Sequence, residues 1–145
     1  RAFEIMQFDC SHTKLNRATG FSFTPEQYND LHQQAKSFYT WVQNQLNIKH
    51  LHAEASILAT DNNGSVISGY IDLLIETEEG YWIIDHKTDN TDDLKERFAY
   101  YFPQLQMYSD ASRQQCPDKP VLGVGVNWVR DGVVSLMNVK NLRLL

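Results

Sequence analysis

The sequence predicts a mixed α/β fold in which a helix is followed by three strands, a second helical region and two further strands. One observation is the period of the apolar residues, which is helical up to about residue 46 and changes to that of strands after residue 50. Another is a pair of strong turn signals, Asp61-Asn62-Asn63-Gly64 and Thr77-Glu78-Glu79-Gly80, which separate apolar runs. With 145 residues, 42% of them hydrophobic, the chain is long enough to bury a core. We therefore expect a single domain over residues 1–145, with an antiparallel three-strand meander inside a mixed sheet flanked by helices.

The clearest helix start lies at Thr24. This residue is predicted to be the N-cap, with Pro25 at the first helical position and Gln27 reaching back to close a capping box. Apolar residues then recur at steps of three and four to about residue 46: Tyr28, Leu31, Ala35, Phe38, Val42 and Leu46. Residues 1–8 also have a helical pattern, and the polar residues 9–23 are expected to form a loop.

The remaining elements follow from apolar runs and turn residues. The meander is expected from three strands at residues 54–60, 65–75 and 81–87. A short helix capped by Thr91 is expected over residues 92–101, and Pro103 is expected to start another helix that ends near Arg113. A turn at Asp131-Gly132 joins the last two strands, at residues 121–129 and 133–139.

Three ionisable residues are expected on one face of the meander. Side chains in a strand alternate between faces, so Asp85 and Lys87 project to the same side. Asp72 lies opposite Asp85 if the loop is Glu78-Glu79, and opposite Lys87 if it is Glu79-Gly80. Both loops put all three residues on one face. Like charges across strands destabilise a sheet, so this arrangement indicates a functional site. The alternative is an exposed face carrying a solvated salt bridge.

Two carboxylates beside a lysine suit the hydrolysis of a phosphodiester. Hard oxygen ligands hold Mg²⁺ or Mn²⁺, and the metal polarises phosphoryl oxygens and lowers the pKa of a bound water. The ammonium group can orient that water or stabilise the transition state. Glu54, at the opening of the preceding strand, could supply a third carboxylate directly or through water. We therefore expect a site that uses Mg²⁺ or Mn²⁺.

Three motifs resemble those of the PD-(D/E)XK nuclease superfamily. In order they are Gly69-Tyr70-Ile71-Asp72-Leu73-Leu74, Asp85-His86-Lys87-Thr88 and Gln104-Leu105-Gln106-Met107-Tyr108. A lone D-x-K is a weak signal, whereas this set in this order is specific. It is most similar to the RecB-like branch, the nuclease domain at the C-terminus of AddA- and RecB-type helicase–nucleases, over residues 25–140. The resemblance implies a restriction-endonuclease-like core with the order α-β-β-β-α-β.

The resemblance also implies roles for individual residues. Asp72 and Asp85 would be metal ligands, the backbone carbonyl of His86 would be a further ligand, and Lys87 would be the catalytic lysine. Glu54 resembles the upstream acid of the family.

Three further residues match the motifs at supporting positions. They are Thr88, which completes D-x-K-T, and the pair Gln104 and Tyr108, which lie four apart and hence on one helix face. This pair would contact DNA or brace the strand residues. The alternative is a core aromatic at Tyr108 with Gln104 as its solvated neighbour.

The sequence departs from the branch in one respect. The branch usually carries a metal-ligating histidine in a G-x-x-x-H setting, and neither His12 nor His32 lies in that context. Residues 1–6 resemble those that follow this histidine, so the ligand is expected upstream of Arg1, in a longer helicase–nuclease of which this chain is a C-terminal fragment. Two cysteines cannot supply the four ligands of the iron–sulfur relatives, so no iron–sulfur cluster is expected.

These observations together predict a Mg²⁺-dependent deoxyribonuclease domain. The net charge of −5 argues against a protein that holds nucleic acid mainly by a basic surface, but carboxylates that bind a divalent metal also make a sequence acidic. The expected partners are DNA, helicase domains of the same chain and a partner helicase–nuclease subunit, in double-strand-break processing and recombination. The alternatives are a non-catalytic DNA-binding or assembly domain and a stand-alone repair or restriction nuclease. With no apolar span or signal segment in the sequence, we expect a cytoplasmic protein with no membrane partner.

Overall fold

The structure is a computed structural model that describes residues 11–90 and 92–138. The chain divides into two compact units, with the boundary between Asn47 and Ile48. The helix expected over residues 1–8 lies outside the described residues, and so does the cap expected at Thr91. Within the described part, no helix is long and apolar enough to cross a membrane.

The first unit contains helices α2 (His12–Thr19) and α3 (Pro25–Gln45). The start of α3 confirms the predicted capping box. The Gln27 N–H donates to Thr24 Oγ1 at 3.1 Å, and the Thr24 N–H donates to Gln27 Oε1 at 2.9 Å. Both bonds satisfy backbone N–H groups that a helix N-terminus otherwise leaves without a partner, and Pro25 has no N–H to satisfy.

The prediction of a loop over residues 9–23 was wrong, because α2 occupies most of it. Ser11 caps this helix by accepting from the Lys14 N–H at 3.3 Å. Gly20 ends the helix in the left-handed conformation, with φ of 69°, and its N–H donates to Asn16 O. The segment is polar, and a helix of two turns needs few apolar contacts: Leu15 is fully buried. In the sequence, this helix is indicated by its cap residues Ser11 and Gly20 rather than by a hydrophobic pattern.

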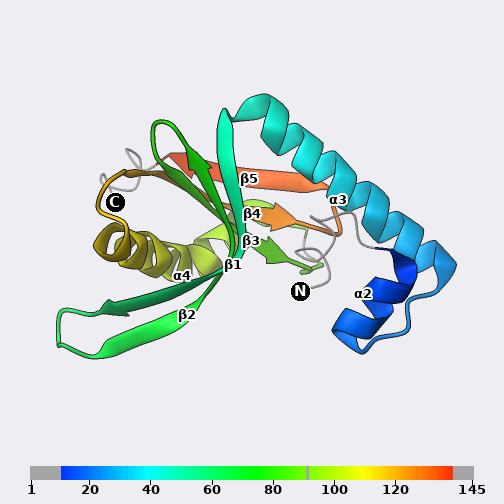
Figure 1. The fold of residues 1–145 in the computed structure, drawn as a ribbon, viewed down its shortest axis with the longest axis horizontal. Coiled ribbons are helices and arrows are strands. Elements are labelled where there is room, and N and C mark those ends of the chain that lie inside the picture. Colours follow the sequence, from blue (N-terminus) through cyan, green and yellow to red (C-terminus); the bar gives the residue numbers. More distant parts are fainter. Residues whose placement is uncertain (1–10, 91, 139–145) are drawn as a thin grey trace. The chain divides into compact units, whose positions relative to one another are not determined.

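The second unit is a five-stranded mixed sheet with the strand order β1-β2-β3-β4-β5 (Figure 1). Neighbouring strands pair antiparallel except β3 and β4, which are parallel and are connected through helix α4. A helical crossover is what two parallel neighbours require. The bounds are β1 (Ile48–Thr60), β2 (Val66–Thr77), β3 (Tyr81–Lys87), α4 (Leu94–Gln115), β4 (Val121–Trp128) and β5 (Val133–Asn138). The predicted fold class is therefore confirmed.

Strand β1 begins six residues earlier than predicted, at Ile48 rather than at Glu54. His50 and His52, which precede the predicted start of the strand, are paired with Glu76 and Leu74 of β2. Long-range pairing with the extended β2 strand imposes this conformation on polar residues that have no strand pattern of their own.

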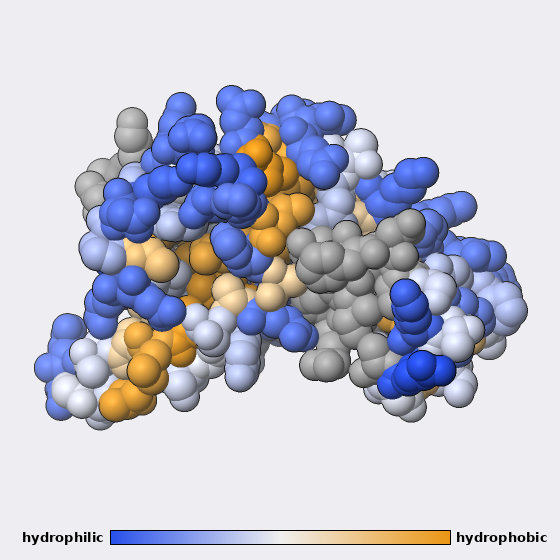
Figure 2. All heavy atoms as spheres, in the orientation of Figure 1, coloured by the Kyte–Doolittle hydropathy of each residue, from blue (hydrophilic) through white to orange (hydrophobic). Residues whose placement is uncertain are grey.

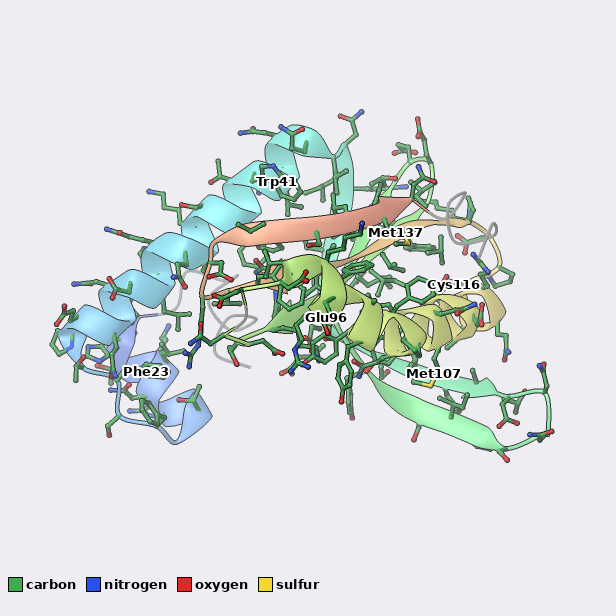
Figure 3. The ribbon with its side chains drawn as sticks, turned by 180° about the vertical axis from the view of Figure 1, so that it is seen from behind. Phe23, Trp41, Glu96, Met107, Cys116 and Met137 are labelled. Carbon is green, nitrogen blue, oxygen red and sulfur yellow. The ribbon has the colours of Figure 1, made fainter. Side chains whose placement is uncertain are left out.

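Helix α4 is continuous where the sequence analysis expected two helices. Its N-cap is Asp93, whose side chain accepts from the Glu96 N–H at 3.0 Å. Pro103 lies inside the helix, at a cost that is typically about 3 kcal/mol. Phe98 before the proline and Leu105 after it both pack into one core, and this shared packing holds the two halves in line. Figure 3 shows Glu96 and Cys116 at the two ends of the helix.

The core lies between α4 and one face of the sheet. Its buried members come from α4 and from all the strands except β5: Ile57, Ala59, Ile71, Ile83, Phe98, Leu105, Tyr108, Ala111, Val121, Val124, Val126 and Trp128. The last turn of α4 also closes the open edge of β1, because the Gln114 and Gln115 side chains bond its backbone at Ser56, Leu58 and Thr60. The other face of this ribbon is exposed and carries large apolar side chains: Leu58, Val66 and Tyr70. Hydrophobic atoms are visible on the β1–β2 ribbon at lower left in Figure 2.

Candidate active site

The β2–β3 hairpin sets the positions of the two predicted acids. Its loop is Glu78-Glu79, closed by the Thr77 N–H donating to Gly80 O at 2.8 Å. Leu73 then pairs with Ile84, and the same register continued by one residue places Asp72 opposite Asp85. Of the two loops that the sequence left open, the structure contains the first.

Asp72 is tied to the neighbouring strand by its side chain. Its Oδ2 accepts from the backbone N–H of His86 at 2.8 Å, where the backbone pairing of β2 and β3 has ended. The carboxylate is half-buried. Asp72 is therefore held beside the residue that follows Asp85.

Asp85 is a buried carboxylate paired with Lys87. The Lys87 Nζ lies 2.7 Å from Asp85 Oδ2, and the two side chains are 21% and 6% exposed, respectively. Asp85 Oδ2 is buried, and the contact that the structure gives it within the described residues is this ion pair with the Lys87 ammonium. Burial lowers the pKa of Lys87, but the contact with Asp85 outweighs burial and raises this pKa above its ordinary value. The amine is therefore an ammonium at neutral pH.

Of the predicted supporting residues, Gln104 and Tyr108 lie on α4, and Thr88 lies just after β3. Gln104 Nε2 donates to the Tyr108 hydroxyl at 3.0 Å, and Tyr108 is a buried member of the core. Burial, together with the negative charge of Asp85, raises the pKa of Tyr108. Tyr108 is therefore a core aromatic whose hydroxyl lies close enough to Asp85 for that charge to affect its pKa. Thr88 is exposed at the end of β3.

Glu54 is less closely connected to the site. It lies in β1 between residues that pair with Leu73 and Ile71, hence level with Asp72, but it is exposed and its φ is 51°. Within residues 11–90 and 92–138, no three His, Cys, Asp or Glu side chains gather into a metal-binding group. The structure therefore brings together Asp72, Asp85 and Lys87, and the role of Glu54 as a third carboxylate stays a prediction.

The sequence analysis missed a second group of polar residues next to Lys87. Asp89, just beyond β3, accepts a hydrogen bond from the Tyr101 hydroxyl and one from Arg97, both on α4. The Tyr101 ring lies under the Lys87 ammonium. The available signal was the position of Tyr101, three residues before Gln104 and hence on the same side of the helix.

The donor set at the hairpin suits a hard divalent cation. Two carboxylates on adjacent strands, that of Asp72 half-buried and that of Asp85 buried beside an ammonium, are oxygen ligands of the kind that Mg²⁺ and Mn²⁺ prefer. Magnesium usually keeps several waters and needs only one or two protein carboxylates. The absence of a three-residue cluster in the described part is therefore compatible with such a site.

A mixed sheet flanked by helices, with two aspartates and a lysine together at one hairpin, is typical of metal-dependent nucleases, and the comparison with family profiles identifies the superfamily. The sequence profile of the PD-(D/E)XK nuclease superfamily matches residues 11–136, so the chain belongs to that superfamily. This confirms the superfamily resemblance. Nucleases of this superfamily generally use divalent metal ions.

The fold has a counterpart among solved structures. The crystal structure of a "putative exonuclease" from Eubacterium rectale matches 98% of this chain with a TM-score of 0.52 and 11% sequence identity. At that identity the match shows a common fold. The chain spans 59% of the length of that protein. No curated protein sequence matches the chain.

Proposed function

We propose that this chain is a Mg²⁺-dependent deoxyribonuclease domain whose site is formed by Asp72, Asp85 and Lys87. The observation that supports this most directly is the buried Asp85 carboxylate beside an ammonium, one strand away from a second carboxylate. A purely structural role would not require two acids opposite each other on adjacent strands. Membership in a nuclease superfamily supports phosphodiester hydrolysis as the chemistry of these residues.

Each residue has a defined part in this proposal. Asp72, Asp85 and the backbone carbonyl of His86 would hold the cation. A bound divalent ion would supply a polarising centre for phosphoryl oxygens and a water of lowered pKa. Lys87 donates from its ammonium to the attacking water or to the charge that develops on the phosphate. Glu54 would act through water rather than as a direct ligand.

The supporting residues act from outside the reacting atoms. In the proposal, Gln104 fixes the Tyr108 hydroxyl, and Tyr108 packs in the core beside Asp85, so both keep the strand residues in place. Thr88 is exposed next to Lys87, where its hydroxyl is available to a DNA phosphate.

A cleavage assay tests the proposed activity. Linear single- and double-stranded DNA would be incubated with this chain and with the complete product of its gene, in Mg²⁺ or in EDTA. Loss of one transition-state donor typically lowers the rate by about 10²–10³-fold, so Lys87→Ala should do so. Lys95→Ala, which removes an exposed lysine of α4, is the matched control and should cleave normally. Equal rates for wild type and Lys87→Ala would refute the assignment.

Metal binding is tested separately by calorimetry. Mg²⁺ or Mn²⁺ should bind weakly without DNA, because a two-carboxylate site depends on water and phosphate oxygens for its remaining ligands. Asp72→Asn should abolish this binding. Unchanged binding in that variant would place the metal elsewhere.

We further propose that the domain belongs to the RecB-like branch and works within a helicase–nuclease that processes double-strand breaks in the cytoplasm. The order and spacing of the three motifs support this, and the family profile, which spans both compact units, supports treating residues 1–145 as one nuclease domain. Helicase motifs encoded upstream in the same gene, with a metal-ligating histidine before Arg1, would agree with the proposal. A gene that encodes the nuclease alone would favour a stand-alone repair or restriction enzyme.

A further inference from the structure

The Lys87 ammonium has two partners. Asp85 Oδ2 lies 2.7 Å from Nζ, and the centroid of the Tyr101 ring lies 4.3 Å from it. The second distance is well within the range of about 6 Å over which a cation is attracted to an aromatic face. Tyr101 belongs to α4, so Lys87 is contacted both by a residue of its own strand, Asp85, and by a residue of the helix that covers the sheet.

Tyr101 is itself fixed by a second ion pair. Its hydroxyl lies 2.8 and 3.0 Å from the two carboxylate oxygens of Asp89. Arg97, one turn earlier on α4, holds the same carboxylate through Nε at 3.0 Å and through Nη2 at 2.9 Å. Burial and the Asp89 charge both raise the pKa of Tyr101, so its hydroxyl remains a donor at neutral pH. The ring also lies against Trp128, with 6.3 Å between the centroids, and Trp128 is fully buried.

We propose that Tyr101 is a positioning residue for Lys87, with its ring holding the ammonium and its Asp89-bound hydroxyl holding the ring. This inference rests on the proposed nuclease function for its kinetic consequences. Lysine has a flexible four-carbon stem, so one ion pair leaves its ammonium free to pivot about Asp85. An aromatic face attracts a cation without carrying a net charge. The ring therefore restricts the ammonium without adding an anion that would compete with a DNA phosphate for it.

The geometry is tested first by NMR, without any activity measurement. The ε-methylene resonances of Lys87, identified by their loss in Lys87→Arg, should be displaced upfield by the ring current of Tyr101. The displacement should persist in Tyr101→Phe and disappear in Tyr101→Leu. Tyr70→Leu removes an exposed tyrosine of β2 and should leave it unchanged. Undisplaced resonances in the wild type, or displaced ones in Tyr101→Leu, would overturn the proposal.

Steady-state cleavage of a linear duplex at saturating Mg²⁺ gives the functional readout. Because small displacements of a reacting group cost up to about 10²-fold, Tyr101→Leu should lower kcat by about 10- to 100-fold while KM stays near the wild-type value. Tyr101→Phe keeps the ring and should recover most of the rate. In the Lys87→Ala background, Tyr101→Leu should cause no further loss, since its effect passes through the lysine. Multiplying losses, or a wild-type kcat in Tyr101→Leu, would refute the positioning role.

A second variant covers the case in which Tyr101→Leu does not fold. Asp89→Asn keeps the ring and weakens the hold on its hydroxyl, so it should reduce both the upfield displacement and kcat, with KM unchanged. Wild-type values for both would refute the proposal. The two hypotheses fail differently: a wild type that does not cleave DNA refutes the proposed function, whereas the NMR comparison still decides the position of Lys87.

Discussion

Removing the Lys87 side chain should destabilise the metal-free protein, because it leaves a buried carboxylate without its countercharge. The Asp85 side chain is only 6% exposed, and the pair is separated by 2.7 Å. At an effective dielectric constant of about 20, Coulomb's law gives roughly 6 kcal/mol of attraction at that separation. The pair also lost hydration on folding, so the net cost of breaking it is smaller, typically about 3–5 kcal/mol for a buried pair. Lys87 is 21% exposed, which favours the lower figure, about 3 kcal/mol.

Thermal unfolding in EDTA measures this cost. For a chain of this length, a loss of about 3 kcal/mol corresponds to a fall in Tm of about 10 °C for Lys87→Ala. The double variant Asp85→Asn/Lys87→Ala removes the stranded charge as well and should recover most of the stability. Lys95→Ala, at an exposed position on α4, should unfold at the wild-type temperature. Mg²⁺ should raise the Tm of Lys87→Ala, since a cation bound by Asp85 offsets the missing ammonium.

Two results would refute this reasoning. A Tm for Lys87→Ala equal to that of the wild type would mean that Asp85 reaches water once the lysine is gone. A double variant less stable than Lys87→Ala would mean that the aliphatic stem of Lys87, rather than its charge, contributes the stability. In either case the Asp85–Lys87 ion pair would not be what stabilises the folded protein at this hairpin.

Three further predictions concern stability. Burial raises the pKa of Asp89, but its contacts with α4 outweigh burial and hold the pKa below the ordinary 3.8; Asp89→Asn should therefore destabilise at pH 7, and urea midpoints should converge with those of the wild type as pH falls below 3.8. A Cβ on Gly123 would lie 2.3 Å from the Trp82 ring, so Gly123→Ala should cost about 1–3 kcal/mol in urea unfolding, whereas Gly69→Ala, into open space, should not. Thr24→Ala should cost about 1 kcal/mol and Thr24→Ser almost nothing, as measured by circular dichroism.

Much of the fold could be predicted because the relevant signals are local. The capping box at Thr24 and the turns at residues 61–64 and 77–80 involve residues within a few positions of one another. The missed helix α2 has local cap signals at Ser11 and Gly20, but two other errors arose where distant contacts decide the structure. Pairing with β2 extends β1 through His50 and His52, and core contacts on both sides of Pro103 keep α4 in one piece. Neither contact leaves a periodic trace in the sequence.

The candidate site divides in the same way. Strand parity alone places Asp72, Asp85 and Lys87 on one face, and the structure has the register of one of the two loops considered. Strand parity contains no information on how deeply a side chain is buried, so it could not reveal that Asp85 is buried and Glu54 exposed. Nor could it reveal that no three-residue metal-binding group forms in the described part. The catalytic roles proposed for the residues of this site stay predictions.

The contacts that Tyr101 and Arg97 make beside Lys87 were not predicted, because they depend on how a helix crosses a sheet. The crossover between the parallel strands β3 and β4 places α4 over the face that carries Asp85 and Lys87. Once it lies there, charges pair off in a definite order: Lys87 with Asp85, and Arg97 with Asp89. Because Arg97 satisfies Asp89, that carboxylate does not draw Lys87 away from Asp85, although it lies only two residues beyond the lysine. The neutral ring of Tyr101 separates the two pairs, which explains why an aromatic residue, rather than a third acid, occupies this position.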